Sequence, residues 1–316
     1  MKRVFYPLLL GIATLCIGFF PILSYAQTEQ DALMMGERKL CVAGTISYSD
    51  WSEYWEGTFK RNNENIGRVS TKTAALMLNY GLRPNLNIMA TLPHISTEAS
   101  QGTLRGLAGF QDLGIAVKWR ALQWQGNRQT VSVFAVGGFS APTSQYNVEL
   151  LPMSIGLGSR VLSGRLISDL QVKKFNLTLS GAYLRRGNVE IDRSAYYTDR
   201  LINSSEVDMP DAGNFQLRAG YRSSRLIAEA FVDITTTFGG FDIRKNDMPF
   251  VSNRMNSTRV GLEGKHYLAR IPALGLHAAA WHTLAGRNVG QSTGFLAGID
   301  YIFDFTPYTA KNQPHE

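Results

Sequence analysis

Residues 295–305 read FLAGIDYIFDF, and this stretch decides the fold. Every second position is apolar: Phe295, Ala297, Ile299, Tyr301, Phe303 and Phe305. Asp300 and Asp304 lie between them. Because successive side chains of a strand point to opposite faces, the pattern predicts a strand with one apolar and one polar face. A helix, with its period of 3.6 residues, does not give this alternation.

The same period of two continues through the chain from about residue 40. In residues 73–80 the apolar set is Ala74, Leu76, Leu78 and Tyr80. Read in this way, the sequence predicts about twelve strands, each near the roughly 9 to 11 residues that a tilted strand needs to cross a membrane. The expected spans are 40–50, 70–80, 86–96, 111–121, 129–139, 159–172, 175–186, 213–223, 225–238, 255–268, 273–285 and 292–305.

The connections between these spans alternate in length. Short ones lie at 81–85, 122–128, 173–174, 223–224 and 269–272. Long ones lie at 51–69, 97–110, 140–158, 187–212 and 239–254, and only the last connection, 286–291, breaks the pattern. The predicted fold class is therefore all-β: a transmembrane antiparallel β-barrel of about twelve strands, with short periplasmic turns and long extracellular loops. The alternative is a secreted soluble barrel or sandwich with the apolar face inward, but soluble strands are usually shorter.

The N-terminus has the features of a cleaved export signal over residues 1–26. Lys2 and Arg3 precede an apolar run, and Ser24-Tyr25-Ala26 gives a small-x-small cleavage site. An uncleaved anchor helix is the alternative. We expect residues 27–39 to be a short periplasmic segment, residues 40–305 the barrel and residues 306–316 a C-terminal tail. Export and a barrel together predict the outer membrane of a Gram-negative bacterium.

Composition excludes several other classes of protein. The chain has 316 residues, of which 44% are hydrophobic and 18% charged, so it can bury a core. Charged or polar residues interrupt every later apolar stretch, which excludes a helical inner-membrane transporter. The net charge is +7, but the basic residues are scattered, so no nucleic-acid partner is expected. With the signal removed, Cys41 is the only cysteine, so an intramolecular disulfide is impossible.

The polar side of the alternating pattern carries many charges. If the apolar face meets lipid, the other face encloses the lumen, and we take its charged residues as candidates for the lumen and for selectivity. These candidates are Lys118, Arg120, Arg165, Asp169, Arg218, Arg222, Glu229, Asp233, Arg259, Glu263, Lys265 and Asp300. The other interpretation is a structural ladder of ion pairs that fills and stiffens the barrel.

Aromatic residues gather near the expected strand ends, as in the interfacial girdles of membrane barrels. They are Tyr48, Trp51, Tyr54, Trp55, Tyr80, Trp119, Trp124, Tyr183, Tyr221, Tyr301, Phe303 and Phe305. The cluster of Trp51, Tyr54, Trp55 and Phe59 in the first long loop also allows a second interpretation, a surface that binds an apolar ligand. We expect these four residues to belong to the girdle.

No motif of catalysis or of metal binding is present. The five histidines lack metal-binding spacings such as HxxxH, and neither a GxSxG elbow nor a P-loop occurs. His282 and Ser292 fall near one rim and suggest a hydrolase pair, but no carboxylate is placed to orient the histidine. We therefore expect no enzyme, no catalytic or metal site and no cofactor.

Several short stretches carry a resemblance to a known family. They include Tyr48-Ser49-Asp50-Trp51, Tyr54-Trp55-Glu56-Gly57-Thr58, Asn79-Tyr80-Gly81-Leu82, Leu86-Asn87-Ile88, Leu92-Pro93-His94 and Gly109-Phe110-Gln111-Asp112-Leu113-Gly114. The chain resembles outer-membrane proteins described as transporters and related to the MetA-pathway of phenol degradation proteins, which are similar to the fatty-acid channel superfamily. The resemblance implies a barrel that admits small hydrophobic or aromatic compounds. Residues 27–39 are short for the N-terminal plug of fatty-acid channels, so a plugged mechanism is not expected.

The predicted function is an outer-membrane channel or transporter for a small, hydrophobic or aromatic molecule, with loop 187–212 gating its mouth. A non-conducting structural or ligand-binding barrel is the alternative. The expected partners are outer-membrane lipid and lipopolysaccharide, a small-molecule solute and the barrel-assembly machinery. The identity of the substrate, the open or sealed state of the lumen and the oligomeric state stay open.

Overall fold

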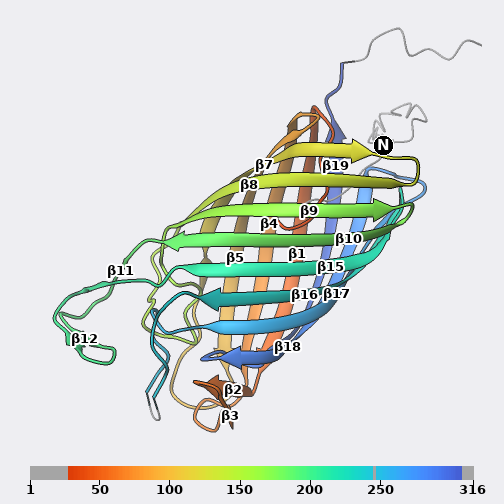
Figure 1. The fold of residues 1–316 in the computed structure, drawn as a ribbon. Helices are drawn as coiled ribbons and strands as arrows, with labels where there is room; N and C mark the ends of the chain where they lie inside the picture. Colours follow the sequence, from red (N-terminus) through yellow and green to blue (C-terminus); the bar gives the residue numbers. More distant parts are fainter. Residues whose placement is uncertain (1–27, 245–246, 308–316) are drawn as a thin grey trace, which may run out of the picture.

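The protein is a closed β-barrel of twelve antiparallel strands (Figure 1). The computed structural model describes residues 28–244 and 247–307. The barrel strands are β1 (Lys39–Trp51), β4 (Val69–Arg83), β5 (Leu86–Ala99), β7 (Asp112–Gln125), β8 (Gln129–Pro142), β9 (Val161–Val172), β10 (Phe175–Arg186), β15 (Ala212–Arg222), β16 (Leu226–Thr237), β17 (Asn256–Tyr267), β18 (Leu274–Arg287) and β19 (Thr293–Asp304).

The barrel closes between its first and last strands. Strand β1 pairs with β4 on one side and with β19 on the other, and the β1–β19 seam runs from Lys39 opposite Asp304 to Asp50 opposite Thr293. Every other barrel strand pairs with its neighbours in the chain. Closure leaves no unpaired edge, as a sheet in lipid requires. In the described part of the chain, no helix is long and apolar enough to cross a membrane.

The predicted strands are confirmed, and most differ from the observed ones by only a few residues at the ends. The largest difference is in β7, which continues to Gln125 past the expected end at 121. A bulge between Arg120 and Leu122 lets β7 stay paired with β8 over this extension. Alternation breaks at a bulge, so the sequence pattern ends there although the strand does not.

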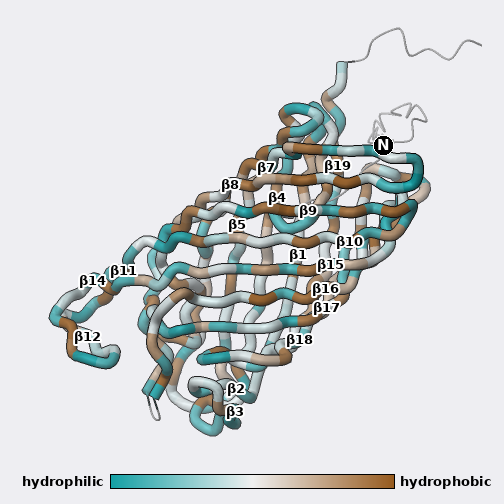
Figure 2. Tube along the Cα trace, in the orientation of Figure 1, coloured by the Kyte–Doolittle hydropathy of each residue, from teal (hydrophilic) through white to brown (hydrophobic). Residues whose placement is uncertain are grey.

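The outer surface of the barrel is apolar, as predicted. Leu76, Val117 and Phe303 are 50%, 42% and 43% exposed, whereas the alternating Asn79 and Lys118 are 3% and 0% exposed. Figure 2 shows this alternation of hydrophobic and hydrophilic residues along the strands. Large apolar side chains that face outward are stable only against lipid, because a soluble barrel turns them into its core.

The two rims of the barrel differ, as the connection lengths predict. One rim carries the tight turns. The other carries the long loops with the short hairpins β2–β3 (Glu53–Glu56, Phe59–Asn62), β11–β14 (Val189–Glu190, Glu206–Val207) and β12–β13 (Tyr196–Tyr197, Leu201–Ile202), and the short strand β6 (Ala108–Phe110) that pairs with β5. In outer-membrane barrels the tight turns are periplasmic and the long loops extracellular.

The loops between β8 and β9, β10 and β15, and β16 and β17 share a small apolar core. It contains Val148, Val189, Ile191, Tyr196, Val207, Met209 and Val251. The hairpin β12–β13 extends beyond the rim (Figure 1). Loop 187–212, which is predicted to gate the mouth, is anchored by this core next to the rim. Its gating role stays a prediction.

Asn288 joins three segments at the long-loop rim. Its side-chain oxygen accepts hydrogen bonds from the backbone N–H groups of Gly57 at 2.7 Å and Ile243 at 3.1 Å. Its side-chain nitrogen donates to Asp242 and to the Arg254 carbonyl, both at 2.8 Å. Arg287 also binds Asp242, through Nε at 2.7 Å and Nη2 at 2.6 Å. The Arg287 guanidinium is the main reason why the pKa of Asp242 falls to about 2.

Two predicted segments lie at or beyond the limits of the described chain. The predicted signal, residues 1–26, lies outside the described residues. Of the predicted tail, residues 306–316, only residues 306 and 307 are described. The segment that the sequence analysis places in the periplasm, residues 27–39, is described from residue 28 and has a different location, inside the lumen.

Candidate functional site in the barrel lumen

The inner wall of the barrel has two different halves. The inner faces of β9, β10, β15, β16 and β17 carry most of the charged residues, and we call this side the charged half. The inner faces of β1, β4, β5 and β19 carry small or uncharged side chains apart from Asp300 and the rim pair of Lys39 and Asp304, and we call this side the neutral half. The neutral half includes Ala43, Thr45, Met77, Met89, Thr91, Leu296 and Gly298.

Arg222 lies at the centre of the charged half. Its Nε atom is 2.6 Å from Glu229 Oε1, and its Nη1 atom is 3.0 Å from Asp169 Oδ1. Its Nη2 atom donates to the Thr178 hydroxyl at 3.0 Å. The Asn176 amide donates to Glu229 at 2.9 Å. All of these side chains are buried, and each charge has partners of the opposite sign, which offsets the cost of removing it from water.

Arg218 extends this network toward β18. Its Nη1 atom lies 2.8 Å from Glu263 Oε2 and 3.4 Å from Glu229 Oε2. Glu263 is in turn 3.3 Å from His277 Nε2. One chain of contacts thus connects five strands, from Asp169 on β9 to His277 on β18. Such a network fixes the relative positions of the strands as well as the charges.

A second cluster lies toward the long-loop rim. Asp233 accepts from Arg259 Nη2 at 2.8 Å and from the Asn214 amide at 2.9 Å. Arg165 donates to Asn214 at 2.8 Å and to the Ser180 hydroxyl at 2.9 Å. Arg165 therefore has neutral hydrogen-bonding partners, whereas Arg259 has a carboxylate.

Lys118 binds the N-terminal segment inside the barrel. Its Nζ atom is 3.0 Å from Asp31 Oδ1 and donates to the carbonyls of Asp31 at 2.8 Å, Leu33 at 3.3 Å and Thr28. Ala32 packs against an apolar cluster of inward side chains from β5, β7, β8 and β9, and Met35 packs with Cys41, Tyr267 and Ile302. The Gln216 amide donates to Gln30 at 3.1 Å.

The location predicted for residues 27–39 is therefore wrong for the described part from Thr28 to Met35, which occupies the lumen. The physical reason is the size of the bore. Side chains already fill much of a twelve-stranded lumen. The eight residues accept the hydrogen bonds of Lys118, cover apolar side chains and fill part of the space that remains. The expectation that the segment is too short for a plugged mechanism stays a prediction.

The other predicted lumen residues are found near the short-turn rim. Lys265 Nζ lies 2.5 Å from Asp300 Oδ1, and both side chains are buried. The Cys41 thiol is 3.9 Å from Asp300 Oδ2. Arg120 lies at the rim itself and donates to the Pro84 carbonyl at 3.1 Å. The twelve candidates thus face inward, but Arg120 and Arg165 join no ion pair among the described residues, and the selectivity role of all twelve stays a prediction.

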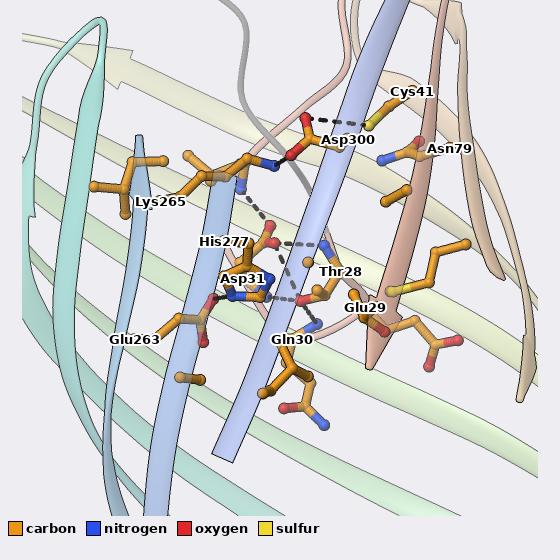
Figure 3. Close-up of a pocket in the computed structure, with 18 of the residues that line it drawn as sticks. Thr28, Glu29, Gln30, Asp31, Cys41, Asn79, Glu263, Lys265, His277 and Asp300 are labelled. Atoms are coloured by element: carbon orange, nitrogen blue, oxygen red, sulfur yellow. Dashed lines mark hydrogen bonds and ion pairs between the residues drawn. The ribbon is translucent and has the colours of Figure 1, made fainter. Parts of the chain in front are cut away.

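A cavity of about 440 Å³ lies between the N-terminal segment and the neutral half (Figure 3). Thr28, Glu29, Gln30, Asp31 and Leu33 form one side of it. Its opposite side includes neutral-half residues, and Arg218, Glu229, Glu263 and Lys265 approach it from the charged half. Most of the surrounding ionic groups already bind one another, so the cavity offers a mainly apolar space with a polar border.

Three groups at the lumen are missed by the sequence analysis. Asp31 and its neighbours carry no periodic signal. His277 and Trp281 do carry one, because they have the same parity along β18 and both point inward, opposite the outward Leu276 and His282. Phe231 likewise falls on the inward parity of β16. Parity could have identified these three residues; an inventory limited to Lys, Arg, Asp and Glu side chains omits all of them.

Trp51 and Trp55 of the first-loop aromatic cluster are not part of a girdle, which corrects that prediction for these two residues. Trp55 is only 7% exposed, and its ring lies where a Cβ on Gly286 would be. Trp51 covers Gly290 in the same way. The outward residues Tyr48, Trp119, Trp124 and Tyr183 do lie exposed near the rims, as a girdle requires. Alternation does not extend into the first loop, so the sequence could not assign a face to the cluster.

The suggested pair of His282 and Ser292 does not form. His282 Nδ1 is 2.8 Å from the Thr293 hydroxyl on the outer side, whereas Ser292 Oγ is 3.1 Å from the Thr283 hydroxyl. His282 and Thr283 are adjacent on β18 and point to opposite faces. Among the described residues, no group of three or more His, Cys, Asp or Glu side chains is arranged to hold a metal ion.

Comparison with solved structures shows the fold. The COG4313 outer membrane channel from Pseudomonas putida F1 has a TM-score of 0.67 and 14% identity, covering 89% of this chain and 100% of that chain. The translocator domain of autotransporter NalP from Neisseria meningitidis has a TM-score of 0.44 and 12% identity, over 85% of this chain and 90% of that one. The CymD monoaromatic hydrocarbon channel has a TM-score of 0.38 and 9% identity, over 87% and 90%.

The last two likenesses are too weak to carry an argument. No protein-family model matches the chain, and no curated protein sequence matches it. The first likeness, at low identity, shows a shared barrel architecture. Together with the apolar outer face, it shows that the chain is a transmembrane β-barrel.

Proposed function

We propose that this protein is an outer-membrane channel through which a small molecule crosses along the neutral half of the lumen. The observation that carries the proposal is the cavity between the N-terminal segment and that half. The charged half is crowded with paired side chains, so it offers a solute little space. The neutral half has small side chains such as Ala43 and Gly298, and its surface needs no ionic partner.

The apolar lining supports a small, hydrophobic or aromatic solute. Met77, Met89, Leu296 and Phe231 contribute apolar surface to the cavity, and burying such surface is favourable for an apolar ligand. The sequence resemblance to transporters related to the phenol-degradation proteins supports the same class. We further propose that the lumen charges exclude large ions by keeping the bore narrow.

A second candidate function is a non-conducting barrel that binds a ligand or only stabilises the membrane. The observation in its favour is the N-terminal segment, which Lys118 holds in the lumen through four contacts. In the channel proposal the same segment restricts flow and does not abolish it.

Planar-bilayer recording of the purified protein separates the two functions. We expect discrete conductance steps from the wild type, and larger or longer steps from Asp31→Ala, because this change removes one Lys118 contact and the turn bonds at Thr28 and Leu33. Asp199→Ala, at the exposed tip of the β12–β13 hairpin, is the matched control and should behave as the wild type. A folded barrel that conducts in neither form would refute the channel.

A further inference from the structure

One acidic residue of the cavity differs from the other ionisable groups around it. The acidic, basic and histidine residues that line the cavity are Glu29, Asp31, Arg218, Glu229, Glu263, Lys265, His277 and Asp300. All of them except Glu29 lie within 3.3 Å of an acidic or basic partner. Among the described residues, Glu29 forms no hydrogen bond and no ion pair. Its carboxylate is therefore available to a solute in the lumen.

Glu29 lies on the N-terminal segment, which forms one side of the cavity. In Figure 3 its carboxylate points away from Glu263 and His277 on the charged half. Its charge acts on Lys118 and Arg165 at longer range. Both of these cations already donate their hydrogen bonds to other groups, so neither neutralises Glu29 by direct contact.

The border of the cavity carries more negative than positive charge. Its acidic residues are Glu29, Asp31, Glu229, Glu263 and Asp300, whereas only Arg218 and Lys265 are permanent cations. Two further cations that pair with these acids, Lys118 and Arg222, do not line the cavity. A cation that enters the space is therefore attracted, and the low dielectric of the surrounding wall strengthens this attraction.

The side of the cavity opposite the N-terminal segment is mainly apolar. Met77, Met89 and Leu296 of the neutral half contribute hydrocarbon and thioether surface to it. The one acidic residue among these strands that lines the cavity, Asp300, is paired with Lys265. A solute that suits both sides has a cationic group at one end and a compact apolar body at the other.

We infer that Glu29 gives the cavity a preference for small cations with an apolar body, such as a primary ammonium ion on a short hydrocarbon. The inference rests on the proposed function and adds the sign of the charge to its solute class. The ammonium group donates hydrogen bonds to the Glu29 carboxylate, and the hydrocarbon packs against the neutral half. Arg218 and Lys265 do not oppose this binding strongly, because carboxylates lie 2.8 Å and 2.5 Å from them.

Binding of two matched probes tests the inference. Cyclohexylammonium and cyclohexanol have the same ring and differ in the charge of their single polar group. Calorimetric titration of the folded protein at neutral pH, in an uncharged detergent and at low salt, should show cyclohexylammonium binding about ten-fold more tightly. Glu29→Gln should reduce this ratio to about one, because the amide keeps the size of the side chain and loses its charge. Glu29→Asp should keep most of the preference.

Glu64→Gln is the matched control, because Glu64 is an exposed acidic residue in the loop between β3 and β4. Its probe ratio should equal that of the wild type. Heat-modified mobility on a gel shows that each variant is folded before the titration. Added salt provides a second measurement on the wild type itself: it should weaken cyclohexylammonium binding and leave cyclohexanol binding nearly unchanged.

Equal affinity of the wild type for the two probes, or an unchanged ratio in Glu29→Gln, would overturn the inference. The titrations need no membrane, so their result is separate from that of the bilayer recordings. A barrel that prefers the cation but never conducts refutes the channel alone. A barrel that conducts but binds both probes equally refutes the preference for cations alone.

Discussion

The two halves of the inner wall differ in what holds their strands together. On the charged half, ion pairs and side-chain hydrogen bonds connect the strands from β9 to β17, and the side chains meet in the lumen. On the neutral half, the strands are held mainly by backbone hydrogen bonds and lipid contact, with ion pairs of Asp300 and Asp304 near the short-turn rim, and the cavity lies next to them. A narrow barrel can therefore concentrate its ion pairs on one side and leave a cavity on the other.

The largest effect is expected from breaking the centre of the charged half. Arg222→Met removes the cation shared by Asp169 and Glu229 and leaves two buried carboxylates with fewer partners. Removing one partner of a buried pair costs roughly 3–5 kcal/mol. The urea midpoint of the folded barrel in detergent should therefore fall strongly. Thr45→Val on the neutral half is the control, and an equal loss there would contradict the division into halves.

The next effect concerns passage and not stability. Thr45→Phe places a ring into the cavity from β1. We expect the single-channel conductance to fall several-fold, while the urea midpoint changes little because the ring enters open space. Gln171→Phe is the comparison variant, because it introduces the same ring at the short-turn end of β9 in the charged half. Equal loss of conductance in both variants would show that solutes do not favour the neutral half.

The smallest effect is expected at the long-loop rim, where the ion pairs are exposed. The folded pKa of Asp242 is about 2, below its ordinary value of 3.8. A depressed pKa stabilises the fold above the ordinary pKa, and this stabilisation is lost as the pH falls from about 4 through about 2. The protection of the Gly57 and Ile243 amides against hydrogen exchange, taken relative to the intrinsic exchange rate at each pH, should therefore fall across this range in the wild type. In Asp242→Asn this loss of protection should be smaller; an identical pH profile would rule out the rim contact as its cause.

The strand pattern was predictable because it depends only on local alternation. Leu76 and Val117 have the parity of lipid-facing residues. The charged residues that have the opposite parity on their strands could therefore only face the lumen. The partners of Lys118 were not predictable in the same way. Most of them are backbone carbonyls of a segment without periodicity, and the contact crosses about 90 positions of the sequence. Ion pairs between particular strands also depend on register, which alternation does not give.

The N-terminal segment has a consequence for biogenesis. Residues 28–35 precede β1 in the chain, yet the seam that encloses them forms with β19, the last barrel strand. Pairing of β1 with β19 therefore closes the barrel around a peptide that is synthesised before all twelve barrel strands. Lys118 is made well before that seam can form, so it can retain the peptide while the wall is still incomplete.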